Sequence, residues 1–213
     1  VGDDTILGLQ LKALKAGGAT DVVVVTGFRA AAVEAAADAA NESGFRVRTL
    51  FNPFYNVADN LGSCWMAREE MAGPFFLLNG DTLFEPAILA RLKAAPEAPI
   101  TLTIDKKAAY DSDDMKVKLD GRRLVDVAKT LAPEDSDGES IGFTRFSRDG
   151  AAAFVETLDQ TVRTPGGLSW WYLKAIAVLA ERGLATTCSI EGLKWGEVDF
   201  PQDLETAAEL FGA

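Results

Sequence analysis

Two aspartates, each at the end of an expected strand, carry the clearest chemical signal in this sequence. Asp81 follows the apolar run 75–78, and Asp199 follows the run 195–198. Open α/β sheets bind ligands at the carboxyl ends of their strands, so both carboxylates are expected at such an edge. Two carboxylates there can share a hard divalent cation such as Mg²⁺, and that cation can hold the phosphates of a nucleotide.

Each aspartate also has an ordinary local explanation. Asp81 suits a helix cap or a turn after Gly80, although Gly80 also lets a sugar or phosphate approach the backbone closely. In the closing helix, Phe200 is the expected cap and Asp203 its partner three residues later. Asp199 then lies outside the cap, which favours another use for its carboxylate.

The elements that must position these residues alternate in the first half of the chain. Helical spacing or alanine-rich composition marks four expected helices, and β-branched or apolar runs mark the expected strands between them. The expected helices are 5–16, 29–41, 61–71 and 86–94, and the expected strands are 21–25, 45–51 and 75–78. This alternation is typical of a parallel doubly wound sheet.

The second half predicts a small antiparallel lobe inserted between the two aspartates, at about residues 106–170. Asp120-Gly121 is a tight-hairpin signal within it. The expected strands are 100–105, 115–119, 123–129, 140–146 and 186–190, and the expected helices are 150–158, 168–181 and 201–210. We therefore expect residues 1–213 to form one α/β domain, Rossmann-like, with a mixed and mainly parallel sheet.

Composition excludes several classes of protein. The 213 residues include no histidine, which removes the usual serine and cysteine hydrolases and His-ligated zinc sites. A net charge of −11 argues against nucleic acids and anionic membranes as partners. The sequence has no apolar run of membrane-spanning length and no P-loop motif. Cys64 and Cys188 lie in apolar contexts, typical of a reducing compartment, so a cytoplasmic location is expected.

A series of short motifs in a fixed order resembles the sugar-phosphate nucleotidyltransferases over essentially the whole chain. The motifs are Leu-Asn-Gly-Asp at 78–81, Asp-Met-Lys-Val at 114–117, Gly-Glu-Ser-Ile-Gly-Phe at 138–143 and Gly-Glu-Val-Asp-Phe-Pro-Gln-Asp-Leu at 196–204. Within that superfamily, the chain looks most like the bacterial phosphocholine and aminoalkylphosphonate cytidylyltransferases. The resemblance implies a GT-A-like fold and transfer of a nucleotide, CMP from CTP above all, to a small phosphorylated acceptor.

The chief departure from the family pattern is at the start. The family opens with a strand and a glycine-rich loop whose Arg and Lys bind the triphosphate, and the matching region of this chain begins only after that point, at Val1. We expect that segment to lie upstream. A protein without it is expected to be a poor catalyst, because donors of this kind stabilise charge on the transferring phosphorus.

The resemblance assigns roles to individual residues. Asp81 and Asp199 would hold Mg²⁺, and Asn60, Ser63 and Gly80 would contact the nucleotide, although a polar loop that caps the next helix explains Asn60 equally well. The remaining assignments concern the lobe: Lys116 and Lys129 would neutralise pyrophosphate or the acceptor phosphate, and Asp114 and Glu139 would bind the acceptor. For any lysine, a solvated surface position is the alternative.

The run Trp170-Trp171-Tyr172 is the most suggestive acceptor feature, because aromatic faces attract ammonium groups with about 0.5–2 kcal/mol per contact. The alternative is an ordinary helix with Trp171 in the core and Trp170 or Tyr172 covering the surface. Leu173 and Lys174 follow where the family often has acidic residues, which weakens the case for choline itself.

These observations predict a Mg²⁺-dependent nucleotidyltransferase that uses a nucleoside triphosphate, CTP first, and a small phosphorylated or phosphonylated acceptor. A sugar-1-phosphate nucleotidyltransferase is the nearest alternative, although its sugar site usually needs a longer lobe. A non-catalytic nucleotide sensor of the same fold is another. An unrelated doubly wound domain is a third, and it predicts that Asp81 and Asp199 lie far apart. The oligomeric state is left open, with a homodimer as one option.

Overall fold

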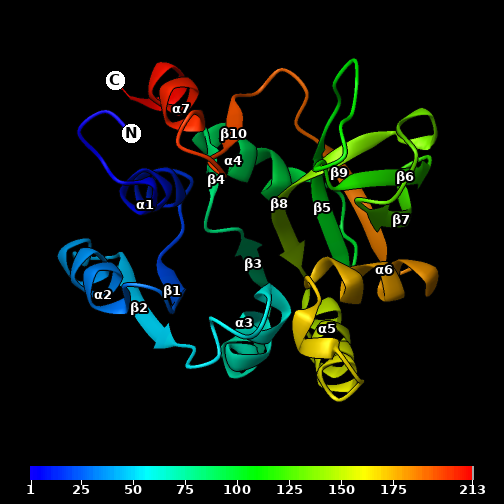
Figure 1. Ribbon diagram of the computed structural model, residues 1–213, viewed down its shortest axis with the longest axis horizontal. Helices are drawn as coiled ribbons and strands as arrows, with labels where there is room; N and C mark the ends of the chain where they lie inside the picture. The colour runs from blue at the N-terminus through cyan, green and yellow to red at the C-terminus, as the bar shows by residue number, and fades with distance from the viewer. Residues whose placement is uncertain (213) are drawn as a thin grey trace.

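The computed structural model describes residues 1–212 and has the mixed α/β class that the sequence predicts (Figure 1). The helices are α1 Ile6–Ala16, α2 Ala30–Ala39, α3 Asn60–Met66, α4 Pro86–Ala94, α5 Arg148–Val162, α6 Leu173–Glu181 and α7 Asp203–Phe211, with short 3-10 helices η1 Arg68–Met71, η2 Pro133–Asp135 and η3 Gly167–Ser169. The strands are β1 Asp21–Thr26, β2 Arg46–Phe51, β3 Phe75–Leu78, β4 Thr82–Phe84, β5 Ile100–Asp105, β6 Lys116–Asp120, β7 Arg123–Ala128, β8 Gly138–Phe146, β9 Ala185–Ser189 and β10 Trp195–Glu197.

The strands form one large sheet and two small ones. The large sheet has the order β3-β8-β5-β9-β7-β6, and β6 also pairs with the start of β8, so the sheet curls back on itself. The strands β1 and β2 pair in parallel, as do β5 and β9, whereas the other pairings are antiparallel. Parallel pairing is therefore less extensive than the alternating first half predicts, because β8 runs antiparallel to both of its neighbours, β3 and β5.

The main hydrophobic core lies between the large sheet and three helices, α3, α5 and α6. Its aromatic centre is formed by Phe146 and Phe154, with ring centroids 4.7 Å apart, and by Phe75, which stacks on Phe146. A second core lies under α4, and a third joins α1 and α2 to β1 and β2. Figure 1 shows the β1–β2 pair at one side of the molecule and the large sheet at the other.

Two expected helices differ from the structure. Helix α6 begins at Leu173, five residues later than expected, so the aromatic run precedes it. Helix α7 begins at Asp203 instead of residue 201, although the expected capping contact forms: the backbone N–H of Phe200 donates to Asp203 Oδ2 at 2.8 Å. Among the described residues, no helix combines the length and apolar character needed to cross a membrane.

Candidate active site

The pairing of β4 with β10 brings Asp81 and Asp199 together, although 118 positions separate them in the sequence. Thr82 lies opposite Glu197 in that pair, and the backbone N–H of Val198 donates to the carbonyl of Asp81 at 3.1 Å. Both aspartates therefore lie at the same end of a short two-stranded ribbon. This closeness is contrary to what an unrelated doubly wound domain predicts.

The carboxylates at this end of the ribbon disturb one another electrostatically. Burial raises the pKa of Asp81, and the negative charge of Asp199 raises it further. Glu197, which was not among the site residues predicted from the sequence, belongs to the same group. Burial of its carboxyl and the charges of Asp81 and Asp199 raise its pKa to about 7, while the residue as a whole stays exposed. Among the described residues, the side chain of Asp199 forms no hydrogen bond or ion pair.

A buried glutamine holds the turn that presents Asp81. Gln10 on α1 is only 5% exposed, and its Nε2 donates to the carbonyls of Asn79 and Thr82, each at 2.8 Å. The hydroxyl of Thr82 donates in turn to the carbonyl of Ile141 at 3.1 Å. The two ends of the turn are thus fixed from α1 and β8. At Gly80, an added Cβ would meet no atom within 4 Å, which leaves the backbone open to a ligand.

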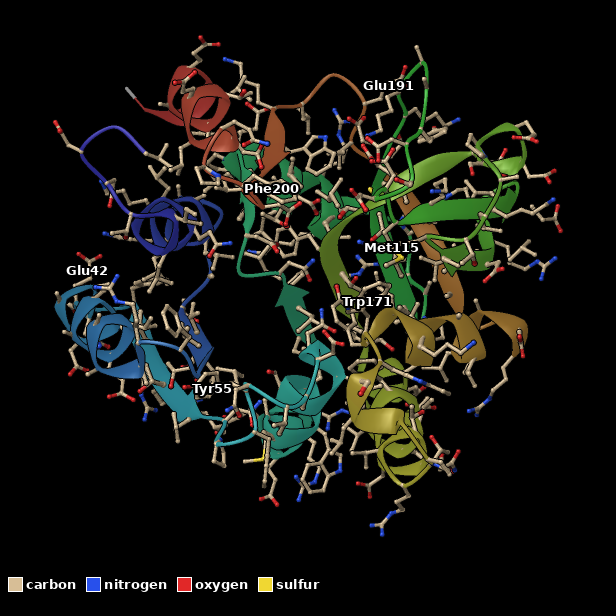
Figure 2. All side chains as sticks on the ribbon, viewed as in Figure 1. Glu42, Tyr55, Met115, Trp171, Glu191 and Phe200 are labelled. Carbon is tan, nitrogen blue, oxygen red and sulfur yellow. The ribbon has the colours of Figure 1, made fainter. Side chains whose placement is uncertain are left out.

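The aromatic run lies before α6 instead of inside a helix, with Trp170 extended and Tyr172 as the cap, and this corrects the expected helical arrangement. Tyr172, expected at the surface, is 2% exposed, and its hydroxyl donates to Asn79 Oδ1 at 3.0 Å. Trp171, expected in the core, is 42% exposed, and Figure 2 shows it at the start of α6. The ammonium of Lys129 lies 4.7 Å from the centre of the Trp171 ring, whereas Trp170 packs against the main core.

The start of α3 is tied to this aromatic segment. Asn60 Oδ1 accepts a hydrogen bond from the backbone N–H of Tyr172 at 2.8 Å, and the N–H of Leu61 donates to the carbonyl of Trp170 at 3.2 Å. Ser63 accepts a hydrogen bond from the amide of Asn52 at 3.2 Å. The amide oxygen of Asn60 therefore holds the aromatic run in place, and a direct contact of Asn60 or Ser63 with a nucleotide stays a prediction.

The residues assigned to the acceptor in the lobe form a charged cluster in which Glu139 is buried, Asp114 is partly buried and Lys107 is exposed. The ammonium of Lys107 bridges Asp114 Oδ1 at 2.7 Å and Glu139 Oε2 at 2.8 Å. Burial raises the pKa of Glu139 to about 7, against the opposing charge of Lys107. Lys116 is also buried, and its ammonium donates to the carbonyls of Asp111 and Asp114. Lys116 thus stabilises the loop before β6, a contact that the sequence did not predict.

The charge of this region suits a bound cation. The charges of Asp81, Asp199 and Glu139 all raise the pKa of Glu197, and the charge of Lys129 lowers it. Among residues 1–212, no three acidic, histidine or cysteine side chains come close enough to hold a metal ion by themselves. A divalent cation here would take one or two carboxylates from the protein and its other ligands from water or substrate phosphates, as Mg²⁺ usually does.

Comparisons with known proteins show what the chain as a whole is similar to. The chain is 28% identical over 225 aligned positions to CMP-5'-(3-aminopropyl)phosphonate synthase from Streptomyces rubellomurinus, covering 95% of the chain and 33% of that protein. It is 30% identical over 211 positions to the bifunctional IPC transferase and DIPP synthase from Rubrobacter xylanophilus, covering 97% of the chain and 45% of that protein. The chain thus spans about a third to a half of the curated relatives it matches. No protein-family profile matches it.

Solved structures extend the comparison to the fold. The inositol-1-phosphate CTP transferase from T. maritima superimposes with a TM-score of 0.78 at 18% identity, covering 97% of this chain and 82% of that one. The chain has the nucleotidyltransferase fold. CTP:phosphocholine cytidylyltransferase from Streptococcus pneumoniae gives a TM-score of 0.75 at 16% identity, with 98% and 86% covered. The resemblance to cytidylyltransferases that the motifs predicted is confirmed.

Proposed function

We propose that this nucleotidyltransferase-fold chain transfers CMP from CTP to a small phosphorylated or phosphonylated alcohol or amine and releases pyrophosphate. The observation that carries the proposal is the meeting of Asp81 and Asp199 at the end of the β4–β10 ribbon, in the fold of CTP transferases. The relatives named for a CMP-phosphonate synthase and an IPC transferase support this class of acceptor.

The reaction that fits this site is an in-line displacement. An oxygen of the acceptor's phosphate or phosphonate attacks the α-phosphorus of CTP and forms the new P–O bond. The bond from that phosphorus to the bridging oxygen breaks, and pyrophosphate leaves with the electron pair. The attacking oxygen is already ionised at neutral pH, so the reaction needs no general base, in agreement with the absence of histidine.

The protein's part is to bind and orient the two anionic substrates. Asp81 and Asp199 would hold Mg²⁺, which when bound supplies positive charge to phosphoryl oxygens. Lys129 is the cation next to this acidic group, and it would neutralise the acceptor's phosphate. The exposed face of Trp171, on which Lys129 now lies, would pack against the body of the acceptor. Positioning and electrostatics would then carry the catalysis.

The test is pyrophosphate release by the full-length protein with Mg²⁺. CTP, UTP, dTTP and GTP are each combined with phosphocholine, 2-aminoethylphosphonate, inositol 1-phosphate and glucose 1-phosphate. We expect turnover with CTP and one of the first three acceptors, reduced at least about a hundredfold in Asp81→Asn and Asp199→Asn because transition-state contacts with a metal are worth several kcal/mol. Asp38→Asn, an exposed aspartate on α2, is the matched control and should retain full activity.

Two further readouts separate the alternatives. Mn²⁺ binding, followed by electron paramagnetic resonance in the presence of CTP, should weaken in Asp81→Asn and not in the control. Binding of CTP without turnover on any acceptor would contradict an enzyme and indicate a sensor, whereas turnover with glucose 1-phosphate would indicate a sugar nucleotidyltransferase.

Lys129→Met tests the role of Lys129 and should raise the KM for the acceptor about tenfold. Lys174→Met is the matched control and should leave this KM unchanged, because Lys174 lies over Trp170, 5.6 Å from the centre of its ring.

A further inference from the structure

We propose that the protein has a second anion-binding pocket, separate from the candidate active site, that takes a small phosphorylated ligand. The pocket has a volume of about 570 Å³ and lies between the end of α4, the end of β5, the β6–β7 turn and β9. That volume falls in the range of small-molecule sites. None of the side chains that line it belongs to the candidate active site.

The sign of the charge in this pocket is opposite to that of the chain as a whole. Arg91, Lys106 and Arg122 line it, and among the described residues no aspartate or glutamate does. The whole chain carries a net charge of −11, opposite in sign to the three cations of this pocket. None of the three forms an ion pair with a carboxylate in the part of the chain that the structure describes. Their charges are left for a ligand.

The two guanidinium groups are held in place by the backbone. Arg91 Nη1 donates to the carbonyl of Ser189 at 3.4 Å and to that of Glu191 at 3.2 Å, and Glu191 is labelled in Figure 2. Arg122 Nη2 donates to the carbonyl of Thr187 at 3.4 Å. A guanidinium has five N–H donors, so both arginines keep donors for the oxygens of a phosphate. Fixed arginines lose less entropy on binding than free ones.

The rest of the lining indicates more than a bare anion. Ala94, Pro96, Ile104 and Leu119 give the pocket an apolar side next to the cations. A phosphorylated molecule with an apolar or sugar-like body matches both parts. Because inorganic phosphate and a nucleotide share the phosphoryl chemistry, both are used as probes below, and their relative affinities show how much the body contributes.

A natural thiol reports whether the pocket is occupied. Cys188 lines the pocket and is partly exposed. The other cysteine, Cys64, is buried, and burial raises its pKa to about 12. Both its burial and its low thiolate fraction should make reagents modify it far more slowly than Cys188. The rate of modification of the native protein therefore measures access to this pocket.

The test compares a doubly anionic reagent, 5,5'-dithiobis(2-nitrobenzoate), with neutral 4,4'-dithiodipyridine. We expect millimolar inorganic phosphate or CTP to slow both reagents at least about fivefold, more than sodium chloride at the same ionic strength. The cations of the pocket should also make Cys188 react faster with the anionic reagent than with the neutral one. The double variant Arg91→Gln with Arg122→Gln should lose both the protection and this preference for the anionic reagent. Arg148→Gln with Arg182→Gln, exposed arginines elsewhere, should keep both.

Two variants guard against misinterpretation. Asp81→Asn should keep the protection, and its loss there would show that the effect comes from the active site and would overturn the proposal. Since Arg91 and Arg122 also bond to backbone carbonyls, their variants are checked for folding by circular dichroism. Lys106→Gln removes one of the three charges without breaking any side-chain hydrogen bond of the described structure, and it should weaken protection at least about threefold. Equal protection in Lys106→Gln and the native protein, or by chloride alone, would also overturn it.

Discussion

Replacement of Gly142 by alanine tests whether the turn that carries Asp81 is held by its neighbours. Gly142 on β8 has a φ of +70°, and an added Cβ would overlap the side-chain amide of Asn79 and lie 2.9 Å from Asn79 Cβ. Rotation of the amide alone cannot relieve a contact with Cβ, so Asn79 itself must move. The side chain of Asn79 accepts a hydrogen bond from the hydroxyl of buried Tyr172, and Asn79 directly precedes Gly80 and Asp81.

The expected cost of Gly142→Ala has two parts. A left-handed conformation costs a residue other than glycine roughly 1–2 kcal/mol, and a disrupted buried hydrogen bond costs about 1–3 kcal/mol. We expect the free energy of unfolding, measured by urea denaturation, to fall by about 2 to 5 kcal/mol. The rate of pyrophosphate release should fall more than tenfold, because displacement of Asn79 shifts the Asp81 carboxylate.

Gly183→Ala is the matched control. Gly183 has a φ of +74°, close to that of Gly142, but an added Cβ there meets no atom within 4 Å. Any effect of alanine on the unfolded chain is common to both variants and cancels in the comparison. Gly183→Ala should lose only the roughly 1–2 kcal/mol of backbone strain and keep its activity. Equal losses of stability and activity in the two variants would refute the reasoning about Asn79.

Two other predictions concern buried polar groups. Folding raises the pKa of Glu139 from 4.5 to about 7, so ionised Glu139 destabilises the native state increasingly from about pH 4.5 to pH 7 and constantly above. Relative to the native protein, Glu139→Gln should gain on the order of 3 kcal/mol of unfolding free energy between pH 4.5 and pH 7. The measurement is urea denaturation at several pH values. Glu134→Gln, which replaces an exposed glutamate, is the control and should show no such gain. Gln10→Met leaves the carbonyls of Asn79 and Thr82 without this donor and should lower the free energy of unfolding by about 1–3 kcal/mol. Gln160→Met, which replaces an exposed glutamine, should change it by less than about 0.5 kcal/mol. Equal effects would contradict the proposal that Gln10 holds the Asp81 turn.

The elements best predicted from the sequence are those whose own residues determine them. The strand 100–105 is observed with the expected bounds, because a run of β-branched and apolar residues between turn signals has few other uses. The sequence indicates Asp81 as a candidate because an apolar strand leads into Asn79-Gly80-Asp81. It indicates Asp199 because a place outside the helix cap leaves this carboxylate without a local partner.

The features that the sequence did not predict depend on distant partners. Trp170 and Tyr172 look helical in isolation, but the backbone groups of both residues are bonded to the start of α3. Gln10 lies on an ordinary amphipathic helix, and nothing local shows that its amide holds a turn about seventy residues away. Glu197 lies within the motif at 196–204, but nothing local shows that its carboxyl is buried beside Asp81 and Asp199. A pattern read along one chain cannot show such contacts.

The chain of contacts behind Asp81 explains why these residues act as a unit. The N–H of Tyr172 is held by Asn60, its hydroxyl by Asn79, and Asn79 leads to the Asp81 turn. On the other side of that turn, Asp199 follows β10, and the backbone N–H of Val198 donates to the carbonyl of Asp81. Apart from the β4–β10 pairing, the two carboxylates have separate supports: Gln10 holds the turn of Asp81, and Asp203 accepts the backbone N–H of Asp199. A fault on the Asn79 side should displace Asp81 while leaving Asp199 where it is, and this predicts weaker cation binding without loss of the β4–β10 pairing.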